Sequence, residues 1–332
     1  MTPSILHGEF DPDLSVDFMG HKMSLPFGIA PVGMSGLVWP NAERILAAKA
    51  AELGIPFTLS TVAAATPEDV ASALGEHAWF QMYPPRDTEI RRDFIARAQA
   101  SGFNALVLTV DVPVASRRER QTRSGLTQPP KLTPRLMAQV AARPAWALAT
   151  ARSGMPHMRM LDKYTTGAHE NLPPTAHIGY LLRTSPDWEY VQWLRDNWAG
   201  PLIIKGVLNA IDVPKLEKIG VDAIWISNHA GRQFDAAPAT MEALPQIRAV
   251  TKLPIILDSG VETGLDILRA LAQGANYVMM GRAWHVALAA LGPDAGPDHL
   301  VHILTEDLKA NMGQLGAKTM QNLPAPRLRP ES

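Results

Sequence analysis

Short apolar runs alternate with amphipathic stretches along most of the chain. The runs are rich in Ile, Leu and Val, and most of them do not alternate between apolar and polar positions. The eight runs cover residues 26–33, 57–60, 78–83, 105–111, 201–207, 223–228, 253–260 and 277–282. This pattern is typical of strands that are buried on both faces of a parallel sheet.

The stretches between these runs carry signals for the beginnings and ends of helices. Thr66 offers a side-chain cap, Pro67 suits the first helical position, and Asp69 is an acid at the third. Further cap candidates are Asn41, Asp87, Ser185 and Asn209. Helix-ending glycines are expected at positions 54, 102, 220 and 274. About eight such units predict an α/β fold, a TIM (β/α)8 barrel, with a doubly wound open sheet as the alternative.

One connection between expected strands is much longer than the others. Residues 112–186 separate the fourth and fifth expected strands and contain several Pro and Arg. A connection this long is usually a functional lid, although an inert insertion is the alternative. Because it leaves the barrel at its functional end, we predict a lid within a single TIM-barrel domain of residues 1–332.

Polar residues gather at the carboxyl ends of the expected strands, where TIM barrels carry their active sites. These strand-end residues are Gly33, Ser60, Gln81, Tyr83, Thr109, Asp111, Lys205, Ser227, Asn228, His229, Asp258, Gly281 and Arg282. One such residue alone is usually a cap or a solvated charge. Together they predict a polar ring around one pocket.

The most informative segment is Ser-Asn-His-Ala-Gly-Arg-Gln, residues 227–233. Histidine titrates near neutrality, which suits His229 as a general base. Arg232 offers a planar, two-pronged donor to a carboxylate. Asp111 is placed to orient His229 and to stabilise its imidazolium form. This combination predicts proton abstraction or hydride chemistry at the carbon next to a carboxylate.

Composition narrows the chemistry. The 332 residues have a formal net charge of −1 and no Cys, which excludes disulfides, thiolate metal sites and cysteine nucleophiles. No basic field indicates a nucleic-acid partner, no His-Glu-x-x-His indicates a metal, and no Gly-x-Gly-x-x-Gly indicates NAD. Without a signal-peptide pattern or an apolar stretch long enough to span a bilayer, we expect a cytoplasmic location, or a peripheral one on the inner membrane.

Several strings, in this order, resemble the FMN-dependent 2-hydroxy acid oxidases and dehydrogenases, a family that acts on lactate, glycolate or mandelate. The resemblance runs from about residue 25 to about residue 317 and centres on residues 227–233. The other matching strings are Ala-Pro-Val-Gly-Met at 30–34, Phe-Gln-Met-Tyr at 80–83, Leu-Thr-Val-Asp-Val-Pro at 108–113, Ile-Lys-Gly at 204–206, Asp-Ser-Gly at 258–260 and Gly-Arg at 281–282. The resemblance implies a TIM barrel, FMN, and oxidation of an (S)-2-hydroxy acid, L-lactate first, to the 2-oxo acid.

On the substrate side, the resemblance assigns roles residue by residue. His229 resembles the base that takes a proton from the substrate, and Asp111 resembles its partner. Tyr83 resembles a tyrosine near the substrate hydroxyl. Arg232 and Arg118 resemble the two arginines that bind the substrate carboxylate, with the adjacent residue 117 as the alternative to Arg118.

On the cofactor side, Lys205 resembles the lysine that faces the N1 and O2 edge of the flavin. A fixed cation there stabilises the negative charge that grows on reduction. The expected FMN contacts are Pro31, Val32, Gly33, Ser60, Gln81, Thr109, Lys205, Ser227, Asp258, Gly260, Gly281 and Arg282.

Two features depart from the family pattern. Glu262 stands where the family has an arginine near the FMN phosphate, which predicts weaker phosphate binding or binding through backbone N–H groups. The chain also begins shortly before the first expected strand, and its first tyrosine is Tyr83, whereas the family has an earlier tyrosine near the substrate.

These departures leave an inactive or altered flavin-binding remnant as the alternative function. A flavin-containing isomerase of diphosphates is a second alternative, which residues 227–233 disfavour. For the oxidation itself, we expect an external electron acceptor, either oxygen, a quinone or a cytochrome, and a homo-oligomeric enzyme.

Overall fold

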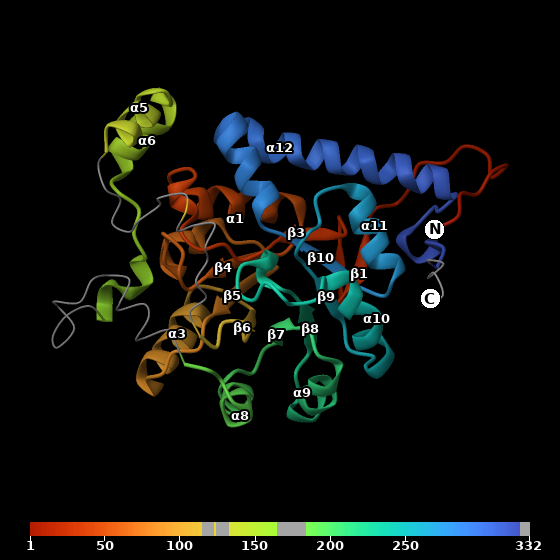
Figure 1. Ribbon diagram of the computed structural model, residues 1–332, viewed down its shortest axis with the longest axis horizontal. Coiled ribbons are helices and arrows are strands. Elements are labelled where there is room, and N and C mark those ends of the chain that lie inside the picture. The colour runs from red at the N-terminus through yellow and green to blue at the C-terminus, as the bar shows by residue number, and fades with distance from the viewer. Residues whose placement is uncertain (115–122, 124–132, 165–183, 326–332) are drawn as a thin grey trace.

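Eight parallel strands close into a barrel at the centre of the molecule (Figure 1). The computed structural model describes residues 1–114, 123, 133–164 and 184–325. Going round the barrel, the strands follow chain order: β3 (Phe27–Ile29), β4 (Phe57–Ser60), β5 (Ala78–Met82), β6 (Ala105–Thr109), β7 (Leu202–Val207), β8 (Ala223–Ile226), β9 (Ile255–Leu257) and β10 (Tyr277–Met280). β10 pairs with β3 and closes the circle. The predicted TIM barrel is confirmed, and the open sheet is wrong.

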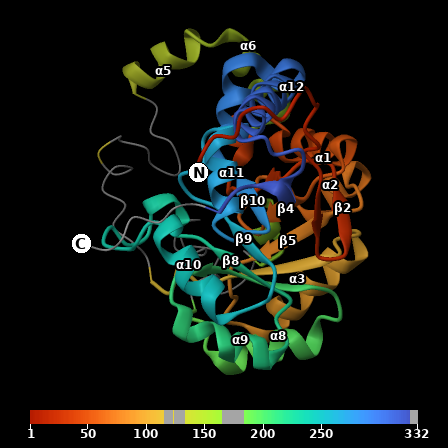
Figure 2. The same cartoon turned by 90° about the vertical axis from the view of Figure 1, so that its right-hand side faces the viewer.

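Helices cover the outside of the barrel (Figures 1 and 2). They are α1 (Ala42–Leu53), α2 (Pro67–Val70), α3 (Thr88–Ala100), α8 (Trp188–Asn197), α9 (Val213–Ile219), α10 (Thr240–Val250), α11 (Gly264–Ala272) and α12 (Arg282–Leu315). The strands are almost wholly buried, as their unbroken apolar runs predict. Within the described ranges, no helix is both long and apolar enough to cross a membrane.

Most predicted caps are confirmed. Thr66 and Asp69 form a capping box at α2, Asp87 caps α3, and Asn209 caps a short 3-10 helix, Ala210–Asp212. All four predicted helix-ending glycines have a positive φ. The prediction of Ser185 as a cap is wrong, because α8 begins three residues later and Asp187 accepts the hydrogen bond from the Tyr190 N–H at 2.8 Å.

Asn41 occupies the predicted cap position before α1 but makes no side-chain cap. Its backbone is left-handed, with φ of 59°, and its side chain accepts no hydrogen bond from the helix. The helix start therefore depends on the backbone turn rather than on the asparagine side chain.

A two-stranded hairpin, which the sequence did not predict, lies at the amino end of the barrel. It consists of β1 (Val16–Phe18) and β2 (His21–Met23). The Phe18 ring lies 5.0 Å from that of Tyr277 and 6.1 Å from that of Trp79, both at strand beginnings. The Tyr277 hydroxyl contacts the Leu25 and Phe27 carbonyl oxygens at 3.0 and 2.9 Å. This end of the barrel is thus closed by aromatic packing.

The long connection after β6 carries helices of its own. They are α5 (Pro134–Ala141), α6 (Pro144–Ser153) and the 3-10 helix η3 (Arg159–Tyr164). Figure 1 shows α5 and α6 at the edge of the molecule, away from the strands. η3 is joined to the barrel's helices by ion pairs, Lys163 with Asp93 at 2.6 Å and Arg159 with Asp69 at 2.8 Å.

Candidate active site

Three polar side chains form a hydrogen-bonded row across the carboxyl ends of β4, β5 and β6. The Gln81 carbonyl oxygen accepts a hydrogen bond from the Ser60 hydroxyl at 2.7 Å, and the Gln81 amide donates to the Thr109 hydroxyl at 2.9 Å. All three residues are buried. Because both ends of the amide are engaged, the orientation of Gln81 is fixed.

A buried cation lies next to this row. Lys205, at the end of β7, is only 5% exposed. Its Nζ donates to the Ser227 hydroxyl at 2.8 Å and lies 3.3 Å from Asp258 Oδ2. Burial acts to lower the pKa of Lys205, but the charges of Asp258 and Asp111 outweigh burial and raise it above its ordinary value. The side chain is therefore a permanent buried positive charge near neutral pH.

Asp258 balances this charge within a well-satisfied network. The Trp225 indole N–H donates to Asp258 Oδ2 at 3.0 Å, and the Ser259 hydroxyl donates to Oδ1 at 2.6 Å. Neither of these two partners was predictable from the sequence. The only signal was a serine between Asp258 and Gly260, with nothing in the sequence to indicate where its hydroxyl would point.

His229, Asp111 and Tyr83 meet at the mouth of the barrel although they are far apart in the chain. His229 Nδ1 lies 3.0 Å from Asp111 Oδ1, and Nε2 lies 3.5 Å from the Tyr83 hydroxyl. An ionised carboxylate can only accept, so Nδ1 carries the proton of this contact and Nε2 is left as the acceptor of the neutral ring.

The surroundings keep Asp111 charged. Burial acts to raise its pKa, but the hydrogen bond from His229 and the charges of Lys205 and His229 hold the pKa below its ordinary value. Asp111 Oδ2 is a buried atom and has no hydrogen-bond partner within the part of the chain that the structure describes. Gly206, with φ of 105°, permits the close approach, because a Cβ there would lie 2.6 Å from Asp111 Cβ. The carboxylate can therefore stabilise a positive charge on the imidazole.

Of the two predicted carboxylate-binding arginines, the structure describes one. Arg232 follows a short 3-10 turn, η5 (His229–Gly231), and is exposed three residues after the histidine. Arg118 and the adjacent position 117 lie outside the described residues.

The predicted flavin and phosphate contacts lie at neighbouring strand ends. Val32 and Gly33 follow β3, and Gly281 follows β10. A Cβ on Gly33 would lie 2.7 Å from Val62 Cγ2, and a Cβ on Gly281 would lie 3.0 Å from Val32 Cγ2. Gly33 thus lets the chain after β3 pass close to Val62, and Gly281, the residue before α12, lets the Val32 side chain pack against the end of β10.

The remaining predicted phosphate-side residues lie near the first turns of α11 and α12. Gly260 has φ of 82° and follows Ser259, Arg282 is the exposed first residue of α12, and Glu262 is exposed just before α11. Helix amino ends attract anions through their N–H groups, so this side of the barrel suits a phosphate even with Glu262 present.

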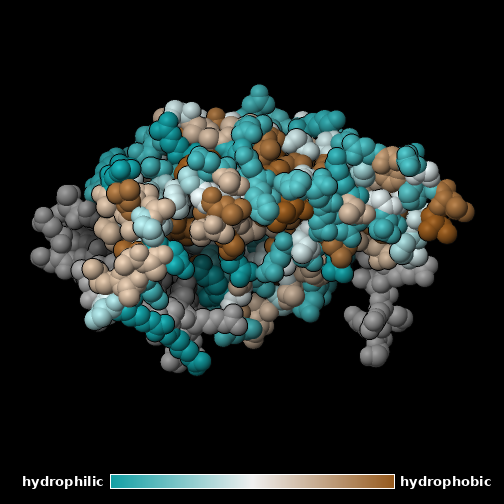
Figure 3. All heavy atoms as spheres, turned by 90° about the horizontal axis from the view of Figure 1, so that it is seen from above, coloured by the Kyte–Doolittle hydropathy of each residue, from teal (hydrophilic) through white to brown (hydrophobic). Residues whose placement is uncertain are grey.

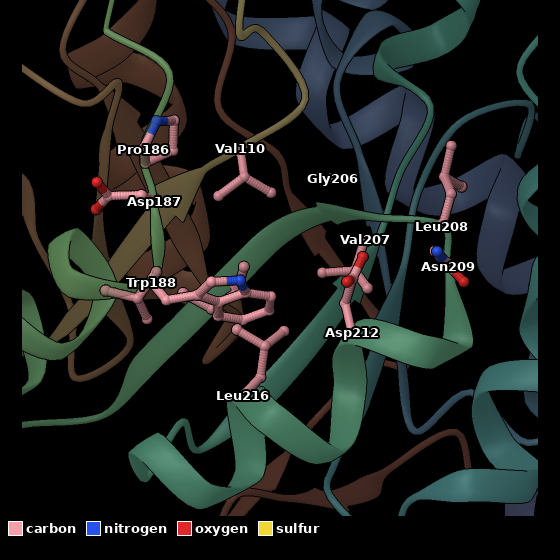
Figure 4. A pocket seen from close by; sticks show the side chains of 12 residues that line it. Val110, Pro186, Asp187, Trp188, Gly206, Val207, Leu208, Asn209, Asp212 and Leu216 are labelled. Carbon is pink, nitrogen blue, oxygen red and sulfur yellow. The ribbon is translucent and has the colours of Figure 1, made fainter.

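A cavity of about 400 Å³ lies outside this polar ring, between α8, α9 and the end of β7. Figure 4 shows Trp188, Val207 and Leu216 among its lining residues. None of the predicted site residues lines it, so the cavity and the candidate chemistry occupy different places.

Comparison with known proteins defines the class. The chain belongs to the family of FMN-dependent 2-hydroxy acid dehydrogenases, because a sequence profile described as FMN-dependent dehydrogenase matches residues 1–330. It is therefore an FMN-dependent flavoprotein oxidoreductase, as the motifs imply. Its Lys205, Gln81 and strand-end glycines fit the needs of that cofactor: a buried cation, an amide of fixed orientation, and backbone without a side chain at positions 33 and 281.

Individual relatives sharpen the comparison. The chain is 38% identical over 326 residues to the L-lactate dehydrogenase of Pectobacterium atrosepticum, covering 96% of this chain and 83% of that one. It is also 38% identical to the L-lactate dehydrogenase of Vibrio parahaemolyticus, covering 96% and 84%.

Among solved structures, a monotopic membrane protein, (S)-mandelate dehydrogenase, matches with a TM-score of 0.91 and 34% identity over 99% of this chain and 87% of that one. A soluble mutant of the membrane-associated (S)-mandelate dehydrogenase of Pseudomonas putida matches with a TM-score of 0.80 and 32% identity, covering 97% and 85%.

Proposed function

We propose that the enzyme oxidises an (S)-2-hydroxy acid, with L-lactate as the leading candidate, to the 2-oxo acid, and that His229 is the base. The observation that carries this proposal is the orientation of His229. Nδ1 is held 3.0 Å from Asp111, which leaves Nε2 to take a proton. The L-lactate dehydrogenases at 38% identity support the choice of substrate.

The substrate loses two protons and two electrons in this reaction. His229 Nε2 takes one proton, and Asp111 stabilises the resulting imidazolium. Tyr83 lies beside Nε2, where its hydroxyl can bind the substrate oxygen. Arg232 and Arg118 hold the substrate carboxylate, which orients the reacting carbon. Bound FMN would supply the acceptor for the electron pair and for the second proton, and an external acceptor, either oxygen, a quinone or a cytochrome, would reoxidise it.

The residues proposed to hold FMN fall into three groups. Lys205, Ser60, Gln81, Thr109 and Ser227 bind the flavin ring's polar edge, and backbone groups of Pro31, Val32 and Gly33 pack on the ring. Asp258 binds the ribityl chain. Gly260, Gly281 and Arg282 bind the phosphate. The buried positive charge of Lys205 supports this arrangement, because reduction places negative charge on that edge.

Mixing the purified, oxidised protein with single 2-hydroxy acids under anaerobic conditions tests this function. Loss of the flavin absorbance with L-lactate, and none with D-lactate, is the expected result. A flavin that no 2-hydroxy acid bleaches would instead indicate the inactive remnant. Adding oxygen, a soluble quinone or a cytochrome to the reduced protein then identifies the acceptor by the rate at which the absorbance returns.

We also propose that residues 112–186 form a lid of a single-domain, cytoplasmic enzyme that binds peripherally to the inner membrane. The apolar side chains of Met137, Leu148 and Met155 are 53–61% exposed, and Arg135, Arg143 and Arg152 lie among them. Figure 3 shows tan and brown, hydrophobic residues beside hydrophilic ones at the end of the molecule that carries α5 and α6. The membrane-bound (S)-mandelate dehydrogenase supports the proposal.

Sedimentation with anionic lipid vesicles tests the membrane proposal. The double variant Met137→Glu/Leu148→Glu is expected to lose vesicle binding, while Val286→Glu, on an exposed position of α12, keeps it. Equal binding of both variants would contradict a docking surface on α5 and α6. Light scattering of the same samples tests the homo-oligomer that we expect.

A further inference from the structure

The turn that carries His229 has an unfavourable backbone. His229, Ala230 and Gly231 all have left-handed φ values, of 56°, 55° and 67°. Only the glycine adopts this conformation without a steric penalty. Two consecutive residues with a Cβ therefore need contacts that hold them there.

Each N–H of this turn is held by a side-chain oxygen. The His229 N–H donates to Ser227 Oγ at 3.1 Å, and the Gly231 N–H donates to Asn228 Oδ1 at 3.1 Å. Both acceptors belong to the same strand end as the turn. The Ala230 N–H instead donates to Ser259 Oγ at 3.0 Å, and Ser259 follows the neighbouring strand, β9. Ser259 thus ties the turn to the next strand of the barrel.

Ser259 occupies a position that favours glycine. Its φ is 73°, a conformation that side chains with a Cβ rarely adopt. Its one hydroxyl hydrogen points to Asp258 Oδ1 at 2.6 Å, so the oxygen is left to accept from Ala230. The Thr240 hydroxyl donates to the Ser259 carbonyl oxygen at 3.1 Å and fixes its backbone. Compared with glycine, serine brings a strained backbone to this position, and the functional group that it adds is the hydroxyl.

We infer that Ser259 is a positioning residue for the proposed reaction. By holding the Ala230 N–H, it keeps the His229 ring between Asp111 and Tyr83, with Nε2 facing the substrate. The same hydroxyl donates to Asp258 Oδ1, whereas Asp258 Oδ2 is held separately by the Trp225 indole and Lys205 Nζ, so the pair of Asp258 and Lys205 does not depend on Ser259. This inference rests on the proposed role of His229.

Two variants separate the hydroxyl from the backbone strain. Ser259→Gly removes the hydroxyl and relieves the strain, whereas Ser259→Ala removes the hydroxyl and keeps the Cβ. We expect both to slow anaerobic flavin reduction by L-lactate about tenfold, the scale of one hydrogen bond, with unchanged FMN affinity. The melting temperature should not fall in Ser259→Gly and should be lower in Ser259→Ala. Ser72→Gly, at an exposed position of the short 3-10 helix Ala71–Ala73, is the matched control.

Imidazole ¹⁵N NMR gives a readout that does not depend on turnover. With the His229 signals assigned by their loss in His229→Gln, the wild type should show one tautomer with the proton on Nδ1. Both Ser259 variants should show exchange between tautomers, because the ring is no longer held against Asp111.

Three results would overturn the inference. Wild-type reduction rates and unchanged imidazole signals in both variants would show that the hydroxyl does not position the ring. Slow flavin reduction in Ser259→Ala together with a wild-type rate in Ser259→Gly would assign the effect to backbone strain. Weaker FMN binding in parallel with the rate would place Ser259 at the cofactor. If the wild-type flavin is not reduced by any 2-hydroxy acid while the imidazole signals still change, the proposed function fails and the positioning role stands.

Discussion

The two ends of the barrel are both buried, but they are built from different chemistry. At the amino end, Phe18, Trp79 and Tyr277 pack as rings, and the one hydroxyl among them is satisfied by backbone carbonyls. At the carboxyl end, Lys205 and Asp258 are buried charges, and the half-buried Asp111 has one oxygen, Oδ2, that finds no hydrogen-bond partner among the described residues. Buried charge costs stability unless it is paired, so its concentration at one end marks the place where chemistry, rather than packing, determines the residues.

Substitution at the amino end should therefore affect stability and leave chemistry intact. Phe18→Ala removes a ring that is 2% exposed, and we expect a loss of about 3–5 kcal/mol in the free energy of unfolding. The rate of flavin reduction per folded molecule should not change. Denaturant unfolding and stopped-flow absorbance measure the two quantities. Phe234→Ala, at a site that is 67% exposed, should change neither quantity and is the control. Slower flavin reduction in Phe18→Ala would show that the two ends of the barrel are coupled.

Removing the buried cation at the carboxyl end should lower both the free energy of unfolding and the rate of flavin reduction. Lys205→Met leaves the buried Asp258 and the half-buried Asp111 without their counter-charge, so we expect a loss of about 3 kcal/mol in the free energy of unfolding near neutral pH. Lys215→Met, at an exposed position of α9, is the comparison, because its ammonium lies over the Trp188 ring, 4.3 Å from the ring centroid.

The pH dependence of that loss has a defined direction. The pKa of Asp111 is lowered in the folded protein, so its contribution is complete above about pH 4 and is lost as the pH falls through the lowered pKa. The pKa of Lys205 is raised, so its contribution is complete below about pH 10 and is lost as the pH rises further. The difference in the free energy of unfolding between wild type and Lys205→Met should be largest between these two pH limits. A gap that is the same at pH 3 and pH 7 would contradict the ion-pair account.

A milder change should affect substrate recognition alone. Arg232→Lys keeps the charge and loses the planar, two-pronged geometry, so kcat/KM for L-lactate should fall on the order of 10- to 100-fold. Melting temperature and FMN content should stay at wild-type values, since Arg232 is exposed. The ratio of kcat/KM between L-lactate and its methyl ester is the diagnostic measurement. If that ratio is unchanged, Arg232 does not bind the carboxylate.

The smallest effect is expected at the phosphate side. Glu262 is exposed, so its repulsion of a phosphate is screened by salt. Glu262→Arg should tighten FMN binding by about threefold at low salt and less at high salt, while Arg282→Ala should weaken binding. Flavin fluorescence titration of the apo-protein measures both, with Glu306→Arg on α12 as the charge-matched control. Identical affinities for all of these variants would place the phosphate elsewhere.

The same contrast explains what the sequence could predict. The eight strands and the polar ring at their carboxyl ends were predictable, because a strand buried on both faces reads as an unbroken apolar run and its polar residues then stand out at one end. The β1–β2 hairpin was not, since its strands have three residues each and leave no periodic signal.

Contacts between different strand ends were also beyond the sequence. His229 and Asp111 could be paired because their residue types suit one another, but nothing in the order Asp-Ser-Gly indicated that Ser259 would reach the Ala230 N–H. Such contacts depend on how neighbouring strands are staggered in the closed barrel, which local patterns do not encode.

The role of His229 is tested most directly by single-turnover reduction of the flavin. Wild type and His229→Gln, matched for FMN content, are mixed anaerobically with saturating L-lactate, and the loss of flavin absorbance is followed. We expect rapid bleaching in the wild type and bleaching at least ~100-fold slower in His229→Gln, because glutamine keeps a polar side chain but cannot act as the base. His302→Gln, at an exposed position of α12, should behave as wild type. Bleaching of His229→Gln at a near wild-type rate would contradict the account.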